Sequence, residues 1–126
     1  MTTIAGYCVR WVDEALIDGH RERFQPGAFQ YAISTNLRVA HDPRPGAVLA
    51  WRVPVMEDEH GLYFEAELDP ENREHRRVVE AVRAGQGGVS FGYRASRSRW
   101  DDGDCEVVVS ARLLEISVLS DASYPA

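Results

Sequence analysis

Residues 87–119 read GGVSFGYRASRSRWDDGDCEVVVSARLLEISVL, and this stretch decides the fold. Alternating apolar and β-branched residues predict a strand from Val89 to about Trp100. The polar turn 101–104 follows, and residues 105–111 and 113–119 predict the last two strands. The C-terminal part of the chain is therefore expected to form neighbouring antiparallel strands.

Upstream, short segments with strand character alternate with turns. The expected strands are 6–12, 37–41, 47–55 and 62–68, with the polar turn 57–61 joining the last two. Residues 19–27 are expected to be a loop, because Pro26 and Gly27 interrupt regular structure, and residues 28–35 to be a short helix.

The clearest helix signal follows residue 68. Asp69 is the expected N-cap, and Pro70 suits the first helical position. An apolar stripe recurs at helical spacing, and Gly85 is placed to end the helix. The stripe consists of Val78, Val79 and Val82.

These elements predict a mostly β (α+β) fold: a compact, mostly antiparallel barrel of about seven strands, flanked by one or two helices. The 126 residues are expected to form one domain, 1–126. No stretch approaches the roughly 20 apolar residues that span a bilayer. The N-terminus lacks the pattern of a secretory signal, so an intracellular, cytoplasmic location is the expectation.

The net charge of −6 argues against nonspecific nucleic-acid binding, because such binding requires positive charge to neutralise phosphates. All 14 basic residues are arginine, so a phosphate-binding lysine loop is excluded. The acidic residues at 101, 102 and 104 lack the spacing of a calcium loop, and we expect neither metal nor cofactor. Cys8 and Cys105 are expected to be buried, reduced thiols.

Three polar positions suggest chemistry. Ser90 shares a strand face with Gly92, and small neighbours would let a substrate backbone approach its hydroxyl. His41 ends an expected strand before a proline-rich loop, where an imidazole could accept a proton. Each also has a purely structural explanation, as a serine at a barrel bend and as a histidine at the edge of the core.

Glu115 interrupts the apolar strand 113–119. A carboxylate in such a strand needs a partner, because an unpaired buried charge is costly. The partner could be the imidazole of a catalytic histidine, or an arginine such as Arg94 or Arg112. The residues alone leave both partners open.

Taken in order, several segments resemble the prohead maturation proteases of tailed phages, a serine protease family similar in fold to the herpesvirus assembly proteases. The matching segments are GY (6–7), QPGAF (25–29), HDP (41–43), GLYF (61–64), GVSFGY (88–93), LEISV (114–118) and YPA (124–126). They span nearly the whole chain. The resemblance implies a serine endopeptidase with Ser90 as nucleophile, His41 as general base and Glu115 as the third member.

The same resemblance implies protein substrates, namely scaffold or capsid protein cleaved inside the procapsid, with possible self-cleavage. It also implies a homodimer, by analogy with the herpesvirus enzymes, whereas the charge and the apolar pattern already make us expect no nucleic-acid and no membrane partner. Two other uses of the fold stay open at this point. One is a protease that activates a partner toxin or nuclease in bacterial defence, and the other is an inactive scaffold module.

Overall fold

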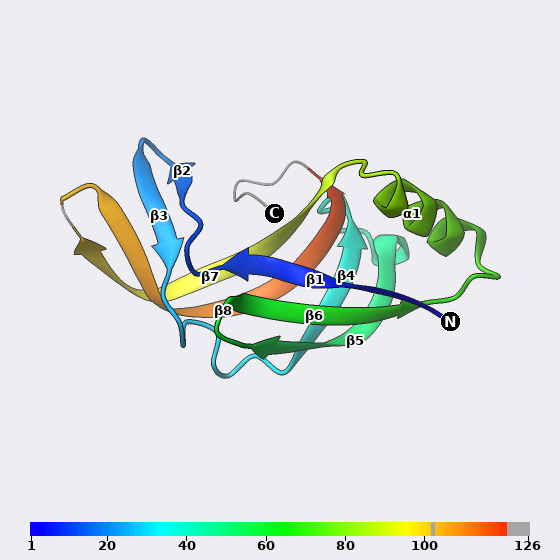
Figure 1. The fold of residues 1–126 in the computed structure, drawn as a ribbon, viewed down its shortest axis with the longest axis horizontal. Helices are drawn as coiled ribbons and strands as arrows, with labels where there is room; N and C mark the ends of the chain where they lie inside the picture. Colours follow the sequence, from blue (N-terminus) through cyan, green and yellow to red (C-terminus); the bar gives the residue numbers. More distant parts are fainter. Residues whose placement is uncertain (102, 121–126) are drawn as a thin grey trace.

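The computed structural model of the chain describes residues 1–101 and 103–120, and strands dominate this part (Figure 1). The elements in order are β1 (Thr2–Arg10), β2 (Ala15–Ile17), β3 (His20–Phe24), β4 (Ser34–Val39), the short 3-10 helix η1 (Pro45–Ala47), β5 (Val48–Glu57), β6 (Gly61–Leu68), α1 (Arg73–Arg83), β7 (Gly88–Asp101) and β8 (Cys105–Ser120). The mostly β fold expected from the sequence is confirmed. The segment 124–126 and Asp102, which the sequence analysis used, lie outside the described residues.

The long hairpin of β7 and β8 is the central element of the sheet. The two separate strands expected at 105–111 and 113–119 are wrong, because β8 runs without interruption from Cys105 to Ser120. Register shifts near Gly92, Ala95 and Arg97 mark irregular positions in the ladder. Such bulges bend and twist a strand without ending it.

The other edge of β8 pairs with β3 and β4, through which the remaining strands join the sheet. Residues 105–108 pair in parallel with β3, and residues 116–118 pair in parallel with β4. The remaining ladders are antiparallel, and the order β1-β6-β5-β4-β8-β3-β2 describes the sheet, with β7 on β8. The loop expected over 19–27 is therefore wrong for His20–Phe24, which forms a strand.

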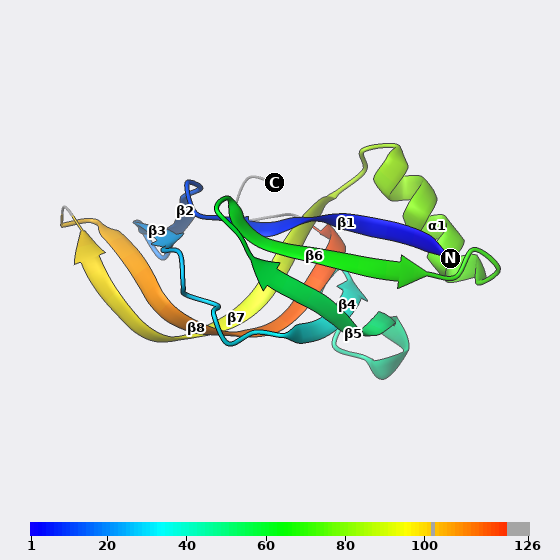
Figure 2. The same cartoon turned by 60° about the horizontal axis from the view of Figure 1, so that its bottom comes forward.

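The sheet curls into a half-barrel (Figures 1 and 2). β1 contacts β7, yet no backbone ladder joins these two strands within the described residues. The barrel is thus incompletely closed. α1 lies at one end of the half-barrel, beside the termini of β4 and β8.

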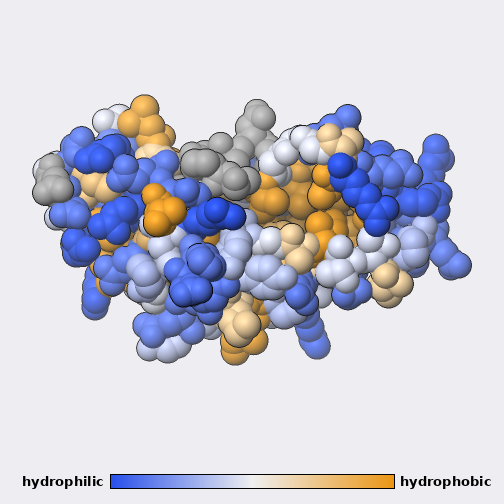
Figure 3. Space-filling view, viewed as in Figure 1, coloured by the Kyte–Doolittle hydropathy of each residue, from blue (hydrophilic) through white to orange (hydrophobic). Residues whose placement is uncertain are grey.

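α1 begins three residues later than expected. The side chain of Asn72, and not Asp69, caps the helix by accepting from the backbone N–H groups of Glu74 (2.9 Å) and His75 (3.1 Å). Of the predicted stripe, Val78 is fully buried, a burial that contributes about 1.5–3 kcal/mol. Figure 3, viewed as in Figure 1, shows apolar atoms at the surface beside α1.

The helix expected over 28–35 is wrong. Successive turns occupy residues 26–31, with backbone bonds from Ala28 to Gln25 O and from Gln30 to Gly27 O. Glu57 fixes this turn, because its carboxylate accepts from the N–H groups of Gly27 (2.9 Å) and Phe29 (2.7 Å). Phe29 is buried, so the turn places an aromatic side chain in the hydrophobic core.

Among the described residues, no helix has the length and apolar character that crossing a membrane requires.

Candidate active site

β7 and β8 place Ser90 and Glu115 on one face of the sheet. Ser90 lies opposite Ser117 in the ladder, and Gly92 lies opposite Glu115. Residues directly opposite each other in an antiparallel pair share a face, and so do residues two apart along a strand. The hydroxyl of Ser90 and the carboxylate of Glu115 therefore project from the same face.

Gly92 leaves room for that carboxylate. A Cβ atom built on Gly92 would lie 2.8 Å from Oε1 of Glu115 and 3.3 Å from its Cγ. The side chain of Glu115 consequently lies across the glycine, where any side chain at position 92 would stand. This close approach explains the second glycine of the GVSFGY motif.

His41 reaches the same place from β4. The strand ends at Val39, opposite Val118, and the next two residues adopt left-handed backbone angles, with φ of 51° at Ala40 and 57° at His41. The N–H of Ala40 donates to the carbonyl of Val118 at 2.9 Å. This turn brings Nδ1 of His41 to 2.5 Å from Oε1 of Glu115.

Ser117 connects the same two residues. Its hydroxyl donates to Oε2 of Glu115 at 2.7 Å and accepts from the backbone N–H of His41 at 3.0 Å. The residue is fully buried. Sequence analysis missed it, although a serine two residues from Glu115 in an otherwise apolar strand was a usable signal, since the two must share a face.

The geometry leaves one imidazole nitrogen available. Because the carboxylate of Glu115 is an acceptor, Nδ1 of His41 carries the proton and Nε2 can act as an acceptor. The His41 side chain is 40% exposed, whereas that of Glu115 is 16% exposed. Ser90 is half-buried, and among the described residues its hydroxyl makes no hydrogen bond to the imidazole.

The loop after His41 is held by charged groups. The guanidinium of Arg38 donates to the carbonyls of Asp42 (2.9 Å) and Arg44 (3.1 Å). The guanidinium of Arg44 bonds the carboxylate of Asp42 and lowers the pKa of that carboxyl to about 2. These contacts restrain the backbone that carries the imidazole.

The other histidines lie elsewhere. His20 bonds Glu106 at 3.0 Å, His60 pairs with Glu59, and Nδ1 of His75 accepts from the N–H of Asp69. A histidine–carboxylate pair is therefore not diagnostic by itself in this molecule. Of these pairs, all among the described residues, only that of His41 and Glu115 lies next to Ser90, because Glu115 is directly across the ladder from Gly92.

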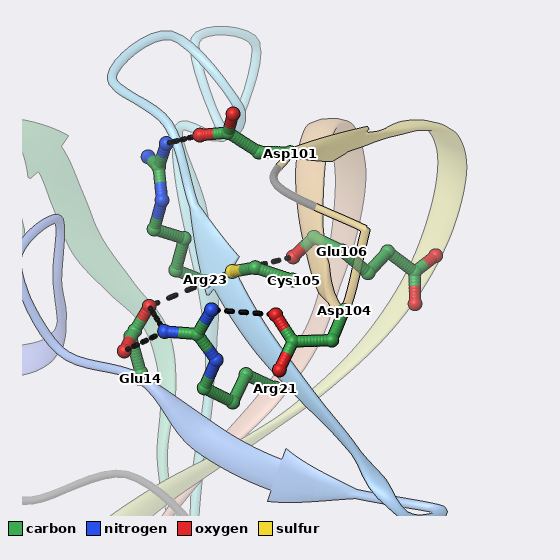
Figure 4. Close-up of polar contacts among 7 residues, drawn as sticks. All are labelled: Glu14, Arg21, Arg23, Asp101, Asp104, Cys105 and Glu106. Carbon is green, nitrogen blue, oxygen red and sulfur yellow. Dashed lines mark hydrogen bonds and ion pairs between the residues drawn. The ribbon is translucent and has the colours of Figure 1, made fainter.

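Asp101 and Asp104, at the two ends of the acidic turn, form ion pairs (Figure 4). Asp101 pairs with Arg23 at 3.1 Å, and Asp104 pairs with Arg21 at 2.6 Å. Within residues 1–101 and 103–120, no group of three potential ligands is positioned to hold a metal ion.

A strand serine, with a histidine–carboxylate pair on the same face of a half-barrel, is the set of groups that serine hydrolases use. Comparison with known proteins agrees with this class. The chain belongs to the caudovirus prohead serine protease family, whose family model matches residues 1–126, the whole chain. No curated protein and no solved structure is significantly similar to it.

Proposed function

We propose that this chain is a serine endopeptidase that cleaves scaffold and capsid protein during phage procapsid maturation, and that it acts inside the procapsid. Ser90 is the nucleophile, His41 the general base, and Glu115 the carboxylate that orients the imidazole. Family membership supports the peptidase class. The assignment of roles rests on the local geometry.

The chemistry follows from the contacts. The Ser90 oxygen forms a bond to the carbonyl carbon of the scissile peptide while its proton passes to Nε2 of His41. The imidazolium then gives that proton to the leaving amine as the C–N bond breaks. Water, deprotonated by the same nitrogen, then bonds to the acyl carbon, and the imidazolium returns the proton to the Ser90 oxygen as its bond to that carbon breaks. Glu115 holds Nδ1–H throughout and stabilises the imidazolium.

One observation carries the proposal. The 2.5 Å contact between His41 and Glu115 joins residues 74 positions apart, on the sheet face that also bears Ser90. Such a contact requires β4 to end beside β8 and Gly92 to lack a side chain. In the enzyme without substrate, the imidazole of His41 and the hydroxyl of Ser90 need not already be hydrogen-bonded, because catalytic hydrogen bonds often tighten only with substrate bound.

Incubation with a purified capsid protein and scaffold protein of a tailed phage that encodes this protease tests the proposal. Wild type is expected to release new N-termini, identified by mass spectrometry, and Ser90→Ala is expected to release none. Ser98→Ala, which changes an exposed serine of the same strand, serves as the matched control and should cleave like wild type. Identical products from wild type and Ser90→Ala would refute the proposal.

A fluorophosphonate probe distinguishes an active enzyme from an inactive scaffold without any knowledge of the substrate. The serine oxygen displaces fluoride from phosphorus, a reaction that requires an activated hydroxyl. We expect labelling of wild type at Ser90, and loss of labelling in His41→Ala. A folded wild type that never reacts would favour the inactive module.

A further inference from the structure

A cleft of about 850 Å³ opens beside His41, between the loop that follows β4 and the helix α1. His41 itself forms part of its wall, so the cleft adjoins the proposed general base. Pockets for small molecules commonly fall in this range of volumes, and a single side chain needs less. The cleft is therefore large enough for at least one substrate side chain.

The floor of the cleft is apolar. Val39, Ala47 and Leu49 line it, and Leu49 is only 7% exposed. An apolar side chain that enters this space removes its own surface and that of the floor from water. Each Å² buried in this way contributes about 25 cal/mol.

The charges at the rim cancel. Asp42 pairs with Arg44 at 2.5 Å, and Glu74 pairs with Arg77 at 2.6 Å. Both carboxyl groups have lowered pKa values because of these arginines, so both are ionised at neutral pH. No uncompensated charge among the lining residues would attract an ionised side chain.

We propose that this cleft is a specificity subsite that accepts an uncharged, apolar side chain of the substrate next to the scissile bond. The inference rests on the proposed protease function. A charged side chain would lose water of hydration on entry and find both ion pairs already satisfied. The subsite therefore selects apolar residues and rejects Asp, Glu, Lys and Arg at one position.

A peptide library derived from a digested proteome tests the subsite, with new termini read by mass spectrometry. Wild type is expected to cut where one position adjoining the bond is enriched in Leu, Ile, Val, Phe and Met and depleted of charge. Cleavage that depends on Ser90 but shows no such preference would overturn the subsite alone. No cleavage at all would instead count against the proposed function.

A charge reversal makes the test specific. Arg77→Glu adds a carboxylate at the rim and leaves Glu74 without its arginine partner, so Lys or Arg should become favoured at that position by about tenfold relative to wild type. Arg83→Glu makes the same change in an exposed residue of the same helix that does not line the cleft. It should keep the wild-type preference, and equal shifts in both variants would refute the subsite.

A different observation supports a second inference. The hydroxyl of Ser117 contacts both the carboxylate of Glu115 and the backbone of His41, and it is fully buried. The left-handed backbone of Ala40 and His41 is unfavourable for residues with a side chain, so it needs restraint from its surroundings. We infer that Ser117 is a positioning residue, which aligns the imidazole and the carboxylate without touching substrate.

Replacement by residues of matched shape tests this role. Ser117→Thr keeps the hydroxyl and Ser117→Val lacks it, while both add similar bulk. We expect kcat to be about 10-fold to 100-fold lower in the valine variant than in the threonine variant, with KM within about twofold. Thermal melts show whether both fold. Equal kcat in two folded variants would overturn the positioning role, whereas inactive wild type would count against the proposed function.

Discussion

Gly92 lies directly across the β7–β8 ladder from Glu115, and a methyl group at Gly92 would stand 2.8 Å from Oε1 of that carboxylate. Real Cβ atoms do not approach oxygen so closely, so one of the two groups would have to move. The atom that would move is the oxygen that bonds His41. The glycine is thus tied to the chemistry through the carboxylate that it accommodates.

Gly92→Ala is therefore expected to lower kcat/KM by at least about tenfold, because the displaced carboxylate no longer orients the imidazole. The free energy of unfolding should change by less than about 1 kcal/mol, since a side-chain end can give way. Peptide hydrolysis and urea denaturation measure the two effects. Gly6→Ala is the control, because a Cβ there meets nothing within 4 Å.

At Gly61, unlike at Gly92, an added side chain is expected to reduce the stability of the fold. A Cβ atom at Gly61 would lie 2.0 Å from the backbone oxygen of Val9, beside the register shift between Tyr7 and Val9. Backbone within a ladder cannot rotate away, so Gly61→Ala should destabilise the fold by about 2 kcal/mol or more. Chemical denaturation should show this loss. A variant as stable as Gly6→Ala would mean that β1 and β6 can separate at this point without cost.

Glu115→Gln should lower kcat by about 100-fold to 10,000-fold, because an amide neither fixes the imidazole tautomer reliably nor stabilises the imidazolium. The chain offers a matched control on the same strand. Glu106 also bonds a histidine, His20, at 3.0 Å, but far from Ser90 along β8. Glu106→Gln should keep near wild-type activity. Equal losses in both variants would mean that the two carboxylates act through stability alone.

The structural features that could be predicted are those determined by residues close together in the sequence. Alternation located the strands that meet at Ser90, and the glycine at position 85 marked the end of α1. The sequence allowed either His41 or an arginine as the partner of Glu115. It could not decide between them, because the decision depends on β4 ending beside β8. Parallel pairing of β3 and β4 with β8 joins distant segments, and no local pattern records it.

The turn at 26–29 illustrates the same limit. Residues after Pro26 have adequate helix propensity, and the turn is favoured by contacts with distant residues, among them the carboxylate of Glu57, 28 positions beyond Phe29. Ser117 escaped notice for a related reason. Its position two residues from Glu115 was visible in the sequence, but its bond to the backbone of His41 depends on the left-handed turn that follows β4.

Glu57→Ala tests the importance of this carboxylate. It would leave the N–H groups of Gly27 and Phe29 without their acceptor, which should cost about 1–3 kcal/mol in the free energy of unfolding. Urea denaturation measures the change. Glu59→Ala alters a neighbouring carboxylate whose side chain is 84% exposed, and it should have little effect. If the two variants were equally stable, the turn would not depend on Glu57.

The two thiols should resist alkylation in the folded protein. Cys8 and Cys105 are free and buried, as predicted, and burial raises the pKa of the Cys8 thiol to about 12. Burial and the carboxylate of Glu14 also raise the pKa of Cys105. Only the thiolate reacts, so a raised pKa removes the reactive form at pH 8.

Iodoacetamide at pH 8 should modify native Cys8 about 1,000-fold more slowly than an unfolded thiol, because the thiolate fraction falls by about that factor between pKa values of about 8.5 and 12. In urea, where the core is exposed, both cysteines should react at ordinary rates. The direction of the Cys8 pKa shift also determines how stability depends on pH. The neutral thiol is the form that the fold favours, so its contribution is complete below pH 8.5 and declines as the pH rises towards 12. Rapid native labelling of Cys8, read by peptide mass spectrometry, would show that β1 opens without global unfolding.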